Sequence, residues 1–153
     1  MSIRVGINGF GRIGRYLTRV LVQQSEIEIV GINDLADKHT LAHLLKYDSV
    51  HRRFPAEIKV EGDYMHAGHH KIRMTSEKDP ANIPWEELGV DIVIEATGIF
   101  RKRDLAAAHL SAGAKKVIIS APPQSEDIKT VVLGINDHIL DGSEKIVSNA
   151  SCT

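Results

Sequence analysis

Three glycines and one carboxylate near the amino terminus have the residue types and spacing that bind a phosphate-linked nucleotide. Gly9, Gly11 and Gly14 form the pattern G-x-G-x-x-G, and Asp34 follows further along the chain. Gly9 allows a tight turn, Gly11 lets the backbone approach a pyrophosphate, and Gly14 lets a helix pack against the preceding strand. The helix N-terminus adds N–H groups and the positive end of a dipole. The pattern predicts a dinucleotide site, although a glycine-rich turn alone is weak support for one.

Asp34 lies at the end of a predicted strand and has two interpretations. It could be a turn residue, or the cap of the helix that follows. Its position about twenty residues after the glycines favours a hydrogen bond to a ribose hydroxyl. A carboxylate there repels a 2′-phosphate, so we expect NAD to bind in preference to NADP. The neighbouring Asn33 is a further candidate for cofactor binding.

The one cysteine of the chain, Cys152, is the second candidate for chemistry. It comes just after a predicted strand, where a thiol beside a cofactor crevice could act as a nucleophile. No helix that could activate the thiol follows within the 153 residues. On the pattern alone, a lone cysteine is more often inert than catalytic.

Alternating strand and helix patterns must position these residues. Strands are expected over residues 3–7, 28–33, 90–94, 116–119, 130–133 and 145–148, and helices over 12–24, 37–46, 85–88 (one turn) and 103–112. Residues 57–75 differ, because they predict a meander of short strands at one edge of the sheet. The alternation predicts an α/β fold, a Rossmann-type open, mostly parallel, doubly wound sheet with helices on both faces. The apolar run 90–94 predicts a strand buried on both faces.

The first helix is expected to bury one apolar face, formed by Ile13, Leu17, Val20 and Leu21. Arg15 and Arg19 lie off that face, and we expect both at the solvated surface. Arg12 lies inside the glycine-rich turn, where it either contacts the cofactor or faces solvent. Thr97 and Gly98 follow a strand end, so they are either cofactor neighbours or a capping residue and a turn glycine.

Two groups of histidines could suggest a metal site. They are His39 with His43, and His66, His69 and His70. The first pair has helical spacing, but Thr40 stands where H-E-x-x-H has its glutamate, so two surface or half-buried histidines are expected instead. The second group has no cysteine or paired acids nearby, and we interpret it as polar turn residues. No metal is expected.

Composition excludes several classes of protein. The chain is 42% hydrophobic and 25% charged with a net charge of −1, which gives no sign of a nucleic-acid or membrane-surface partner. No apolar run approaches the roughly 18 residues of a membrane span. Because a strand is expected from residue 3, we expect no signal peptide. One cysteine excludes an internal disulfide and is typical of a cytoplasmic protein.

The sequence resembles the amino-terminal, NAD-binding part of the glyceraldehyde-3-phosphate dehydrogenase family. The stretches that carry the resemblance are INGFGRIGR (7–15), LLKYDSVH (44–51), EATG (95–98), GAKKVIISAP (113–122) and, most specifically, SNASCT (148–153). The resemblance implies that Cys152 is the catalytic nucleophile and that Asp34 binds the adenosine ribose. It also implies that Gly9, Phe10, Gly11, Arg12 and Ile13 contact the pyrophosphate, with Gly14 completing the motif, and that Thr97, Gly98, Phe100 and Ser120 line the cofactor groove. Lys78 stands beside the adenine where the family often has arginine, and so loses planar stacking.

The family activity implied is oxidation of a triose-phosphate aldehyde through a cysteine thioester, with hydride passing to NAD and phosphate releasing an acyl phosphate. In the family, the base histidine, the phosphate-binding residues and much of the tetramer interface lie in the second half. We therefore expect residues 1–153 to form one NAD-binding domain that ends at the catalytic-cysteine motif without a substrate domain, and to bind NAD without turnover. Two alternatives stay open: the same domain of an erythrose-4-phosphate dehydrogenase, and a non-catalytic nucleotide-binding or interaction module.

Overall fold

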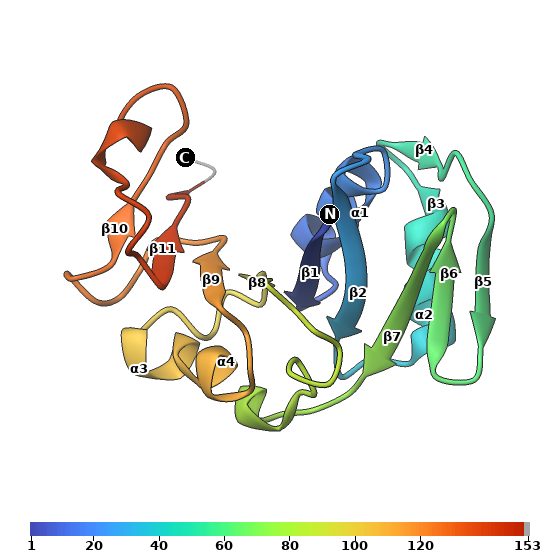
Figure 1. The fold of residues 1–153 in the computed structure, drawn as a ribbon. Coiled ribbons are helices and arrows are strands. Elements are labelled where there is room, and N and C mark those ends of the chain that lie inside the picture. Colours follow the sequence, from blue (N-terminus) through green and yellow to red (C-terminus); the bar gives the residue numbers. More distant parts are fainter. Residues whose placement is uncertain (152–153) are drawn as a thin grey trace.

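The computed structural model describes residues 1–151, which form a nine-stranded sheet with helices on both faces (Figure 1). The sheet strands are β1 (Ile3–Asn8), β2 (Ile27–Asn33), β5 (Ile58–Glu61), β6 (Tyr64–Ala67), β7 (His70–Thr75), β8 (Ile92–Glu95), β9 (Lys116–Ile119), β10 (Lys129–Thr130) and β11 (Ile146–Ser148). The helices are α1 (Arg12–Leu21), α2 (Lys38–Lys46), α3 (Arg103–Ala106) and α4 (Ala108–Ser111), with short 3-10 turns η1 (Pro80–Asn82) and η2 (Asp137–Ile139). A separate hairpin pairs β3 (Tyr47–Asp48) with β4 (Arg52–Arg53).

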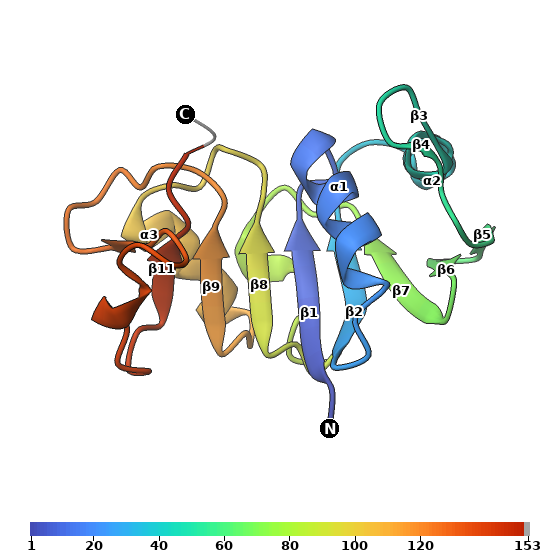
Figure 2. The ribbon, with the colours of Figure 1, turned by 90° about the horizontal axis from the view of Figure 1, so that it is seen from above.

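The strand order is β10-β11-β9-β8-β1-β2-β7-β6-β5. The strands from β10 to β7 in this order run parallel, and β6 and β5 extend the β7 edge in antiparallel pairing (Figure 2). This confirms the predicted open, mostly parallel sheet. The strand order reverses at β1, because β2 lies on one side of it and β8 on the other. A crevice is therefore expected at the carboxyl ends of β1 and β8.

Apolar side chains pack on both faces of the sheet, as predicted. Leu17 of α1 and Leu41 and Leu45 of α2 pack in one cluster with residues of β1 and β2. On the other face, Ala106 and Leu110 of α3 and α4 pack in a cluster with residues of β9. The expectation that residues 90–94 are buried on both faces is wrong, since burial alternates along β8 and β9. Their second face is half-buried because α1 covers β1 and β2 instead (Figure 2).

The inward face of α1 differs from the predicted one. Ile13 and Val20 are exposed, and the buried positions include Gly14 and Thr18, while Leu17 is half-buried. Thr18 Oγ1 satisfies its hydrogen bond inside the helix by donating to the Gly14 carbonyl at 2.9 Å. Small residues at these positions let the helix lie close to the strands, while Leu17 and Leu21 pack against the core beside them and Ile13 and Val20 are left exposed.

Arg19 is not a surface residue, and the prediction that it is solvated was wrong. Its Nη2 donates to the carbonyls of Leu45 at 2.6 Å and Arg52 at 2.9 Å, and its guanidinium lies over the Phe54 ring. Arg15 is half-buried, and its Nη1 donates to the Phe10 carbonyl at 3.0 Å. Both arginines therefore hold backbone segments next to α1, because a guanidinium has donors enough for several carbonyls.

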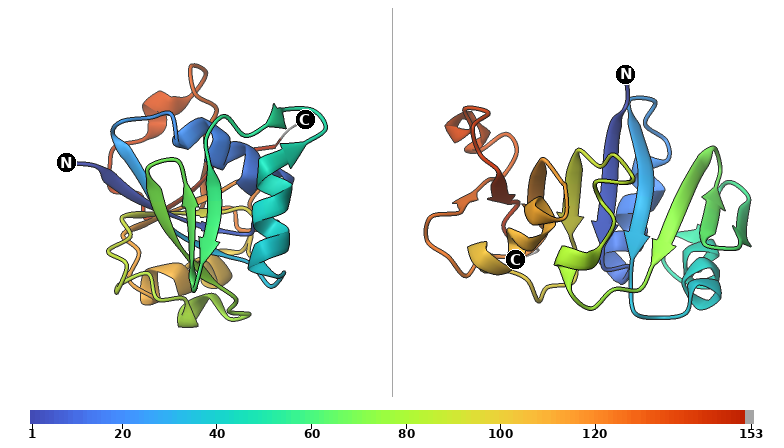
Figure 3. Two further views of the ribbon diagram at one scale, coloured as in Figure 1. Left: turned by 90° about the vertical axis from the view of Figure 1, so that its right-hand side faces the viewer. Right: turned by 60° about the horizontal axis from the view of Figure 1, so that its bottom comes forward.

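The predicted meander of residues 57–75 is confirmed as β5, β6 and β7, and it forms one edge of the sheet (Figure 3). The interpretation of His70 as a polar turn residue was wrong. His70 is only 8% exposed, and its Nδ1 accepts a hydrogen bond from the Ile29 amide at 3.1 Å. Burial lowers the pKa of His70 below its usual value. His70 is therefore a structural residue that ties β7 to β2.

The later elements follow the prediction with smaller differences. The expected helix over 103–112 is divided into α3 and α4 at Ala107, and it ends before Gly113, which has a φ of +111°. Residues 85–88 form the predicted single turn, in which the Leu88 amide donates to the Pro84 carbonyl, and this turn does not continue into a longer helix. Across residues 1–151, no helix is both long enough and apolar enough to cross a bilayer.

Candidate functional site

The glycine-rich turn joins the end of β1 to the start of α1, and its three glycines meet different constraints. Gly9 has a φ of +95°, and a Cβ atom there would lie 2.9 Å from the backbone of Thr97. A Cβ atom on Gly14 would lie 2.2 Å from the Gly9 carbonyl oxygen. A Cβ atom on Gly11, in contrast, would have no protein atom within 4 Å among the described residues. Protein packing therefore requires Gly9 and Gly14, whereas Gly11 leaves an open cradle in front of the helix N-terminus.

Asp34 links the end of β2 to this turn. Its Oδ2 accepts a hydrogen bond from the Phe10 amide at 2.8 Å, and its Oδ1 accepts one from the Ala36 amide at 2.9 Å. A carboxylate has about four lone-pair sites, so acceptor capacity is left for further hydroxyl donors. Asp34 thus acts as a turn residue, which was one of its two interpretations, without losing the capacity to bind a sugar diol.

A cleft of about 360 Å³ opens at the carboxyl ends of β1, β2 and β8. It is lined by Asn8, Gly9, Gly11, Asn33, Asp34, Leu35, Glu77, Lys78, Ala96, Thr97, Ile99 and Phe100. The cleft lies where the strand order reverses, which is the place where open α/β sheets bind ligands. Its lining combines the buried polar side chains of Asn8 and Asn33 with the exposed apolar side chains of Leu35 and Ile99, as expected of a site for an amphipathic cofactor.

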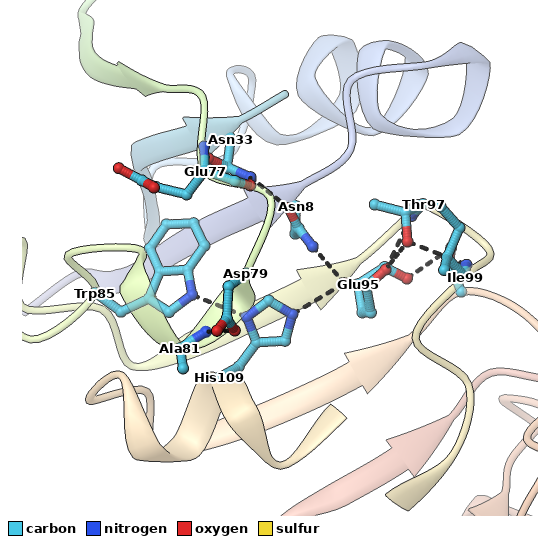
Figure 4. Close-up of polar contacts among 11 residues, drawn as sticks. Asn8, Asn33, Glu77, Asp79, Ala81, Trp85, Glu95, Thr97, Ile99 and His109 are labelled. Carbon is cyan, nitrogen blue, oxygen red and sulfur yellow. Dashed lines mark hydrogen bonds and ion pairs between the residues drawn. The ribbon is translucent and has the colours of Figure 1, made fainter. Parts of the chain in front are cut away.

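Below the cleft, buried side chains join the ends of three parallel strands (Figure 4). Asn33 Nδ2 donates to Asn8 Oδ1 at 2.9 Å, and Asn8 Nδ2 donates to Glu95 Oε1 at 2.5 Å. Glu95 is 1% exposed, and its Oε2 accepts hydrogen bonds from the amide and the hydroxyl of Thr97. These contacts fix the two segments that flank the cleft, the turn after β1 and the turn after β8.

Hydrogen bonds extend from the same carboxylate into the core, through a histidine to the one tryptophan of the chain (Figure 4). His109 Nε2 lies 2.9 Å from Glu95 Oε1, and Trp85 Nε1 donates to His109 Nδ1 at 3.0 Å. Both rings are fully buried. The sequence offered no local signal for this chain of contacts, since Glu95 is separated from His109 by 14 residues and from Asn8 by 87.

The structure brings seven of the predicted cofactor-binding residues together in the cleft: Gly9, Gly11, Asn33, Asp34, Lys78, Thr97 and Phe100. Gly14, Gly98, Phe10, Arg12, Ile13 and Ser120 do not line it. The Phe10 side chain is buried, and Ile13 and Gly98 are exposed. The Ser120 hydroxyl donates to the Glu95 carbonyl at 3.1 Å. Cys152 lies outside the described residues.

Arg12 had two interpretations, and its side chain forms an ion pair with Asp48 at the tip of the β3–β4 hairpin. Backbone hydrogen bonds from His51 and Val50, helped by the Arg12 guanidinium, lower the pKa of Asp48 to about 2. The carboxylate therefore remains charged at neutral pH. The Arg12 side chain is directed to this hairpin rather than into the cleft, although its amide belongs to the first turn of α1.

Five cleft residues were not predicted: Asn8, Leu35, Glu77, Ala96 and Ile99. Leu35 and Ile99 are exposed large apolar residues next to predicted motifs, and an exposed apolar residue beside a strand end is a usable signal for a binding rim. Glu77 is held at the cleft by its backbone: its amide donates to Asn33 Oδ1, and its carbonyl accepts from Asn33 Nδ2. Such a contact has no pattern in the sequence.

The histidine groups do not gather into a metal site within residues 1–151, where no three His, Cys, Asp or Glu side chains lie close enough to hold an ion. His39 and His43 are both exposed on α2. His66 lies near Glu61, with 3.6 Å between the ring nitrogen and the carboxylate oxygen.

The residues around the cleft fit a dinucleotide. The Gly11 cradle would admit a phosphate that any side chain would obstruct, and the first-turn N–H groups of α1 have no acceptor within the helix. Asp34 retains acceptor capacity for a ribose, and Leu35 and Ile99 offer apolar surface to a base.

Comparison with known proteins agrees with this geometry. The family described as "Glyceraldehyde 3-phosphate dehydrogenase, NAD binding domain" matches residues 3–103. Similar proteins include the glyceraldehyde-3-phosphate dehydrogenase of Geobacillus stearothermophilus, 54% identical over 154 residues, and that of Mycolicibacterium smegmatis, 55% identical over 161 residues. A Bacillus subtilis relative, glyceraldehyde-3-phosphate dehydrogenase 1, is 51% identical over 154 residues. Each comparison covers 100% of this chain and 46–47% of the relative, so the chain spans about half the length of these proteins.

Proposed function

Because this chain belongs to the glyceraldehyde-3-phosphate dehydrogenase family and contains its NAD-binding domain, we propose that it is the coenzyme-binding half of an NAD-dependent phosphorylating aldehyde dehydrogenase. The observation that carries the proposal is the open cradle at Gly11, which lines the same cleft as the Asp34 carboxylate and the buried side chains of Asn8 and Asn33. Phosphate, ribose and base would each meet suitable groups within one crevice.

NAD would be held by residues on three strand ends. Backbone amides from Gly9 to Ile13 would bind the pyrophosphate, with the N-terminus of α1 adding favourable dipole charge. Asp34 would accept hydrogen bonds from the adenosine ribose, and Lys78 would lie beside the adenine. Thr97, Gly98, Phe100 and Ser120 would form the side of the groove along β8 and β9. When bound, NAD supplies the hydride acceptor for aldehyde oxidation.

Cys152 is the proposed nucleophile. Its thiolate would form a C–S bond with a triose-phosphate aldehyde to give a hemithioacetal, and loss of hydride would convert this adduct to a thioester. Attack by inorganic phosphate would break the C–S bond, release an acyl phosphate and restore the thiolate. Formation of the thiolate removes the thiol proton, which the adduct oxygen takes up in the hemithioacetal, and oxidation then releases the proton of that hydroxyl. The reaction therefore needs a general base, which contributes about 10²- to 10⁴-fold to such reactions.

We further propose that the 153 residues alone bind NAD without steady turnover of glyceraldehyde-3-phosphate. In the family, the base and the substrate-phosphate residues lie in the half that this chain does not span. Residues 1–153 would then be one NAD-binding domain that ends at the catalytic-cysteine motif. Linear production of NADH from this chain and the triose phosphate would contradict this part of the proposal.

A homo-oligomer in the cytoplasm is proposed for the protein as a whole. Exposed apolar residues of the segment between β10 and β11 support a further interface, with Leu133 at 88% and Ile135 at 74% exposure. The single cysteine supports a reducing compartment. Light scattering behind a sizing column would give the mass of the particle, and a strictly monomeric mass over a range of concentrations would count against self-association.

Calorimetric titration with NAD and with NADP tests the proposed cofactor. We expect saturable binding of NAD, weaker binding of NADP, and loss of binding in Gly11→Val, which fills the cradle. Cys152→Ser is the matched control, and we expect it to bind NAD as the unmodified chain does. Failure of the unmodified chain to bind NAD, or tighter binding of NADP, would overturn the proposal.

A further inference from the structure

We propose that Glu95 and His109 are positioning residues for the NAD cleft, and that they couple occupancy of the cleft to the environment of the buried Trp85 indole. The inference rests on the proposed function, because it takes NAD as the ligand of the cleft. It concerns residues that lie below the cleft: Glu95, His109 and Trp85 do not line it.

Glu95 has its acceptor capacity filled by donors. Oε1 faces the Asn8 amide nitrogen and His109 Nε2, and Oε2 faces the Thr97 amide and hydroxyl. A carboxylate accepts about four hydrogen bonds and donates none, so the site suits an ionised glutamate. The side chain is 1% exposed, and therefore water cannot replace a lost partner without rearrangement of the site.

The protonation of His109 follows from its two neighbours. An indole N–H only donates, so His109 Nδ1 must accept from Trp85 Nε1. The ring then carries its proton on Nε2, where it can donate to Glu95 Oε1. A doubly protonated ring would place two N–H groups against each other at Trp85. The neutral tautomer therefore joins the indole to the carboxylate through a directed pair of hydrogen bonds.

Trp85 forms the fixed end of this chain of contacts. Its ring lies against the side-chain positions of two glycines, since a Cβ atom on Gly6 would lie 2.6 Å from the ring and one on Gly31 would lie 2.9 Å from it. The indole thus packs against β1 and β2 and is fully buried. Because the sheet holds Trp85 in place, a movement of the residues that bind Glu95 at the cleft would alter the hydrogen bonds that join Glu95, His109 and Trp85.

The movable end lies at the cleft. Asn8 and Thr97 line the cleft and both bind Glu95, and each is next to a part of the glycine-rich turn: Asn8 precedes Gly9, and the Thr97 backbone is close to it. Glu95 therefore sets the separation between the turn after β1 and the turn after β8. A ligand that contacts these two turns changes the hydrogen bonds that Asn8 and Thr97 make with Glu95. Through Glu95 and His109, it also changes the hydrogen bond that the Trp85 indole donates.

The one tryptophan makes this coupling measurable, because the ¹⁵N-labelled chain has a single indole N–H resonance. We expect this resonance to shift progressively as NAD is added, with the same dissociation constant that calorimetry gives. A purely structural role for the buried contacts would leave the resonance in place, since the indole does not touch the cleft.

Two variants interrupt the coupling at different atoms. In His109→Asn, Oδ1 can replace Nδ1 as the acceptor for Trp85, but the shorter side chain leaves no donor at the position of Nε2 beside Glu95. In Glu95→Gln, the amide NH₂ faces a donor in either orientation. We expect both variants to bind NAD about tenfold more weakly, which corresponds to one lost buried hydrogen bond, and to lose most of the NAD-induced indole shift.

His70→Asn is the matched control, because it removes another buried histidine, one that accepts from a backbone amide outside this set of contacts. We expect it to keep both the NAD affinity and the indole shift. The inference is overturned if the indole resonance of the unmodified chain does not move at saturating NAD, or if both variants fold and bind NAD as tightly as the control. Absence of NAD binding by the unmodified chain would instead refute the proposed function, and this inference with it.

Discussion

The Asp34 carboxylate accepts a hydrogen bond from the Phe10 amide at 2.8 Å, which ties the end of β2 to the turn that follows β1. The same side chain lines the cleft. One residue thus shapes the glycine-rich turn and presents negative charge to whatever enters beside it. Turn geometry and cofactor preference are therefore coupled at this position.

Asp34→Asn should remove the negative charge of this side chain while keeping part of its hydrogen bonding to the glycine-rich turn. The amide oxygen can still accept from one of the two backbone N–H groups, but the charge that repels a 2′-phosphate is lost. We expect NAD binding to weaken by about tenfold, as for the loss of one charge-assisted hydrogen bond, and the preference for NAD over NADP to shrink. Parallel titrations with both dinucleotides measure this, with Asp63→Asn in the β5–β6 turn as the surface control. An unchanged ratio of the two affinities would contradict the assigned role.

Gly11→Ala should weaken NAD binding without loss of stability, whereas Gly14→Ala should lower the stability of the fold. A methyl group on Gly11 meets no described protein atom, so the unfolding free energy should change by less than about 0.5 kcal/mol while NAD binding is strongly weakened. A methyl group on Gly14 would meet the Gly9 carbonyl at 2.2 Å, and overpacking of this kind costs about 1–3 kcal/mol of stability. Thermal unfolding and NAD titration of both variants distinguish the two effects. Normal NAD binding by Gly11→Ala would show that no phosphate lies against that cradle.

His70 should make the fold sensitive to mild acid. Burial lowers the pKa of His70 below its usual 6.5, with Glu28 opposing and His69 adding to this effect. The unfolded chain therefore takes up the proton first, so stability is highest above about pH 6.5 and declines as the pH falls toward the lower pKa of the folded state. His70→Asn keeps an acceptor near the Ile29 amide and should show a shallower decline in urea midpoint between neutral pH and pH 5. The exposed His39→Asn is the control, and an equal effect of both substitutions would remove His70 as the cause.

Asp48 should contribute stability that is lost in stronger acid. Its pKa is lowered from 3.8 to about 2 by hydrogen bonds from the His51 and Val50 amides, with help from Arg12. The folded state is thus favoured by the ionised form above about pH 3.8, and this advantage disappears as the pH falls to about 2. Asp48→Asn should lower stability at neutral pH. It should also reduce the decrease in unfolding temperature that accompanies acidification below about pH 3.8. Glu126→Gln, which alters an exposed acid in the loop before β10, should leave that decrease unchanged.

The parts of the fold that the sequence predicts are those whose determinants are local. Glycine spacing and the change from strand to helix period lie within residues 3–21, and β1 and α1 begin where expected. The strand at Lys116–Ile119 and the stop at Gly113 likewise depend on adjacent residues. Asp34 was found because its distance from the glycines reflects the length of one strand–helix–strand unit.

The residues that were misjudged depend on partners far along the chain. Arg19 is buried because carbonyls 26 and 33 residues away need a donor, and His70 is buried because the Ile29 amide, 41 residues away, needs an acceptor. No periodicity in the sequence reports such pairs. Ile13 was placed inside because it is apolar, yet the position of closest approach is that of Gly14, where even a Cβ atom would meet the Gly9 carbonyl, and Ile13 is left exposed.

The central position of β1 has a consequence for how the protein is made. The meander from β5 to β7 pairs residues that are close in sequence, so it can form as soon as it leaves the ribosome. In contrast, Asn8 meets Glu95 across 87 residues, and β1 lacks its second neighbour until β8 has been synthesised. The ligand crevice needs both strands and is lined by residues as far along the chain as Phe100, so it is among the last features of residues 1–100 to assemble during translation.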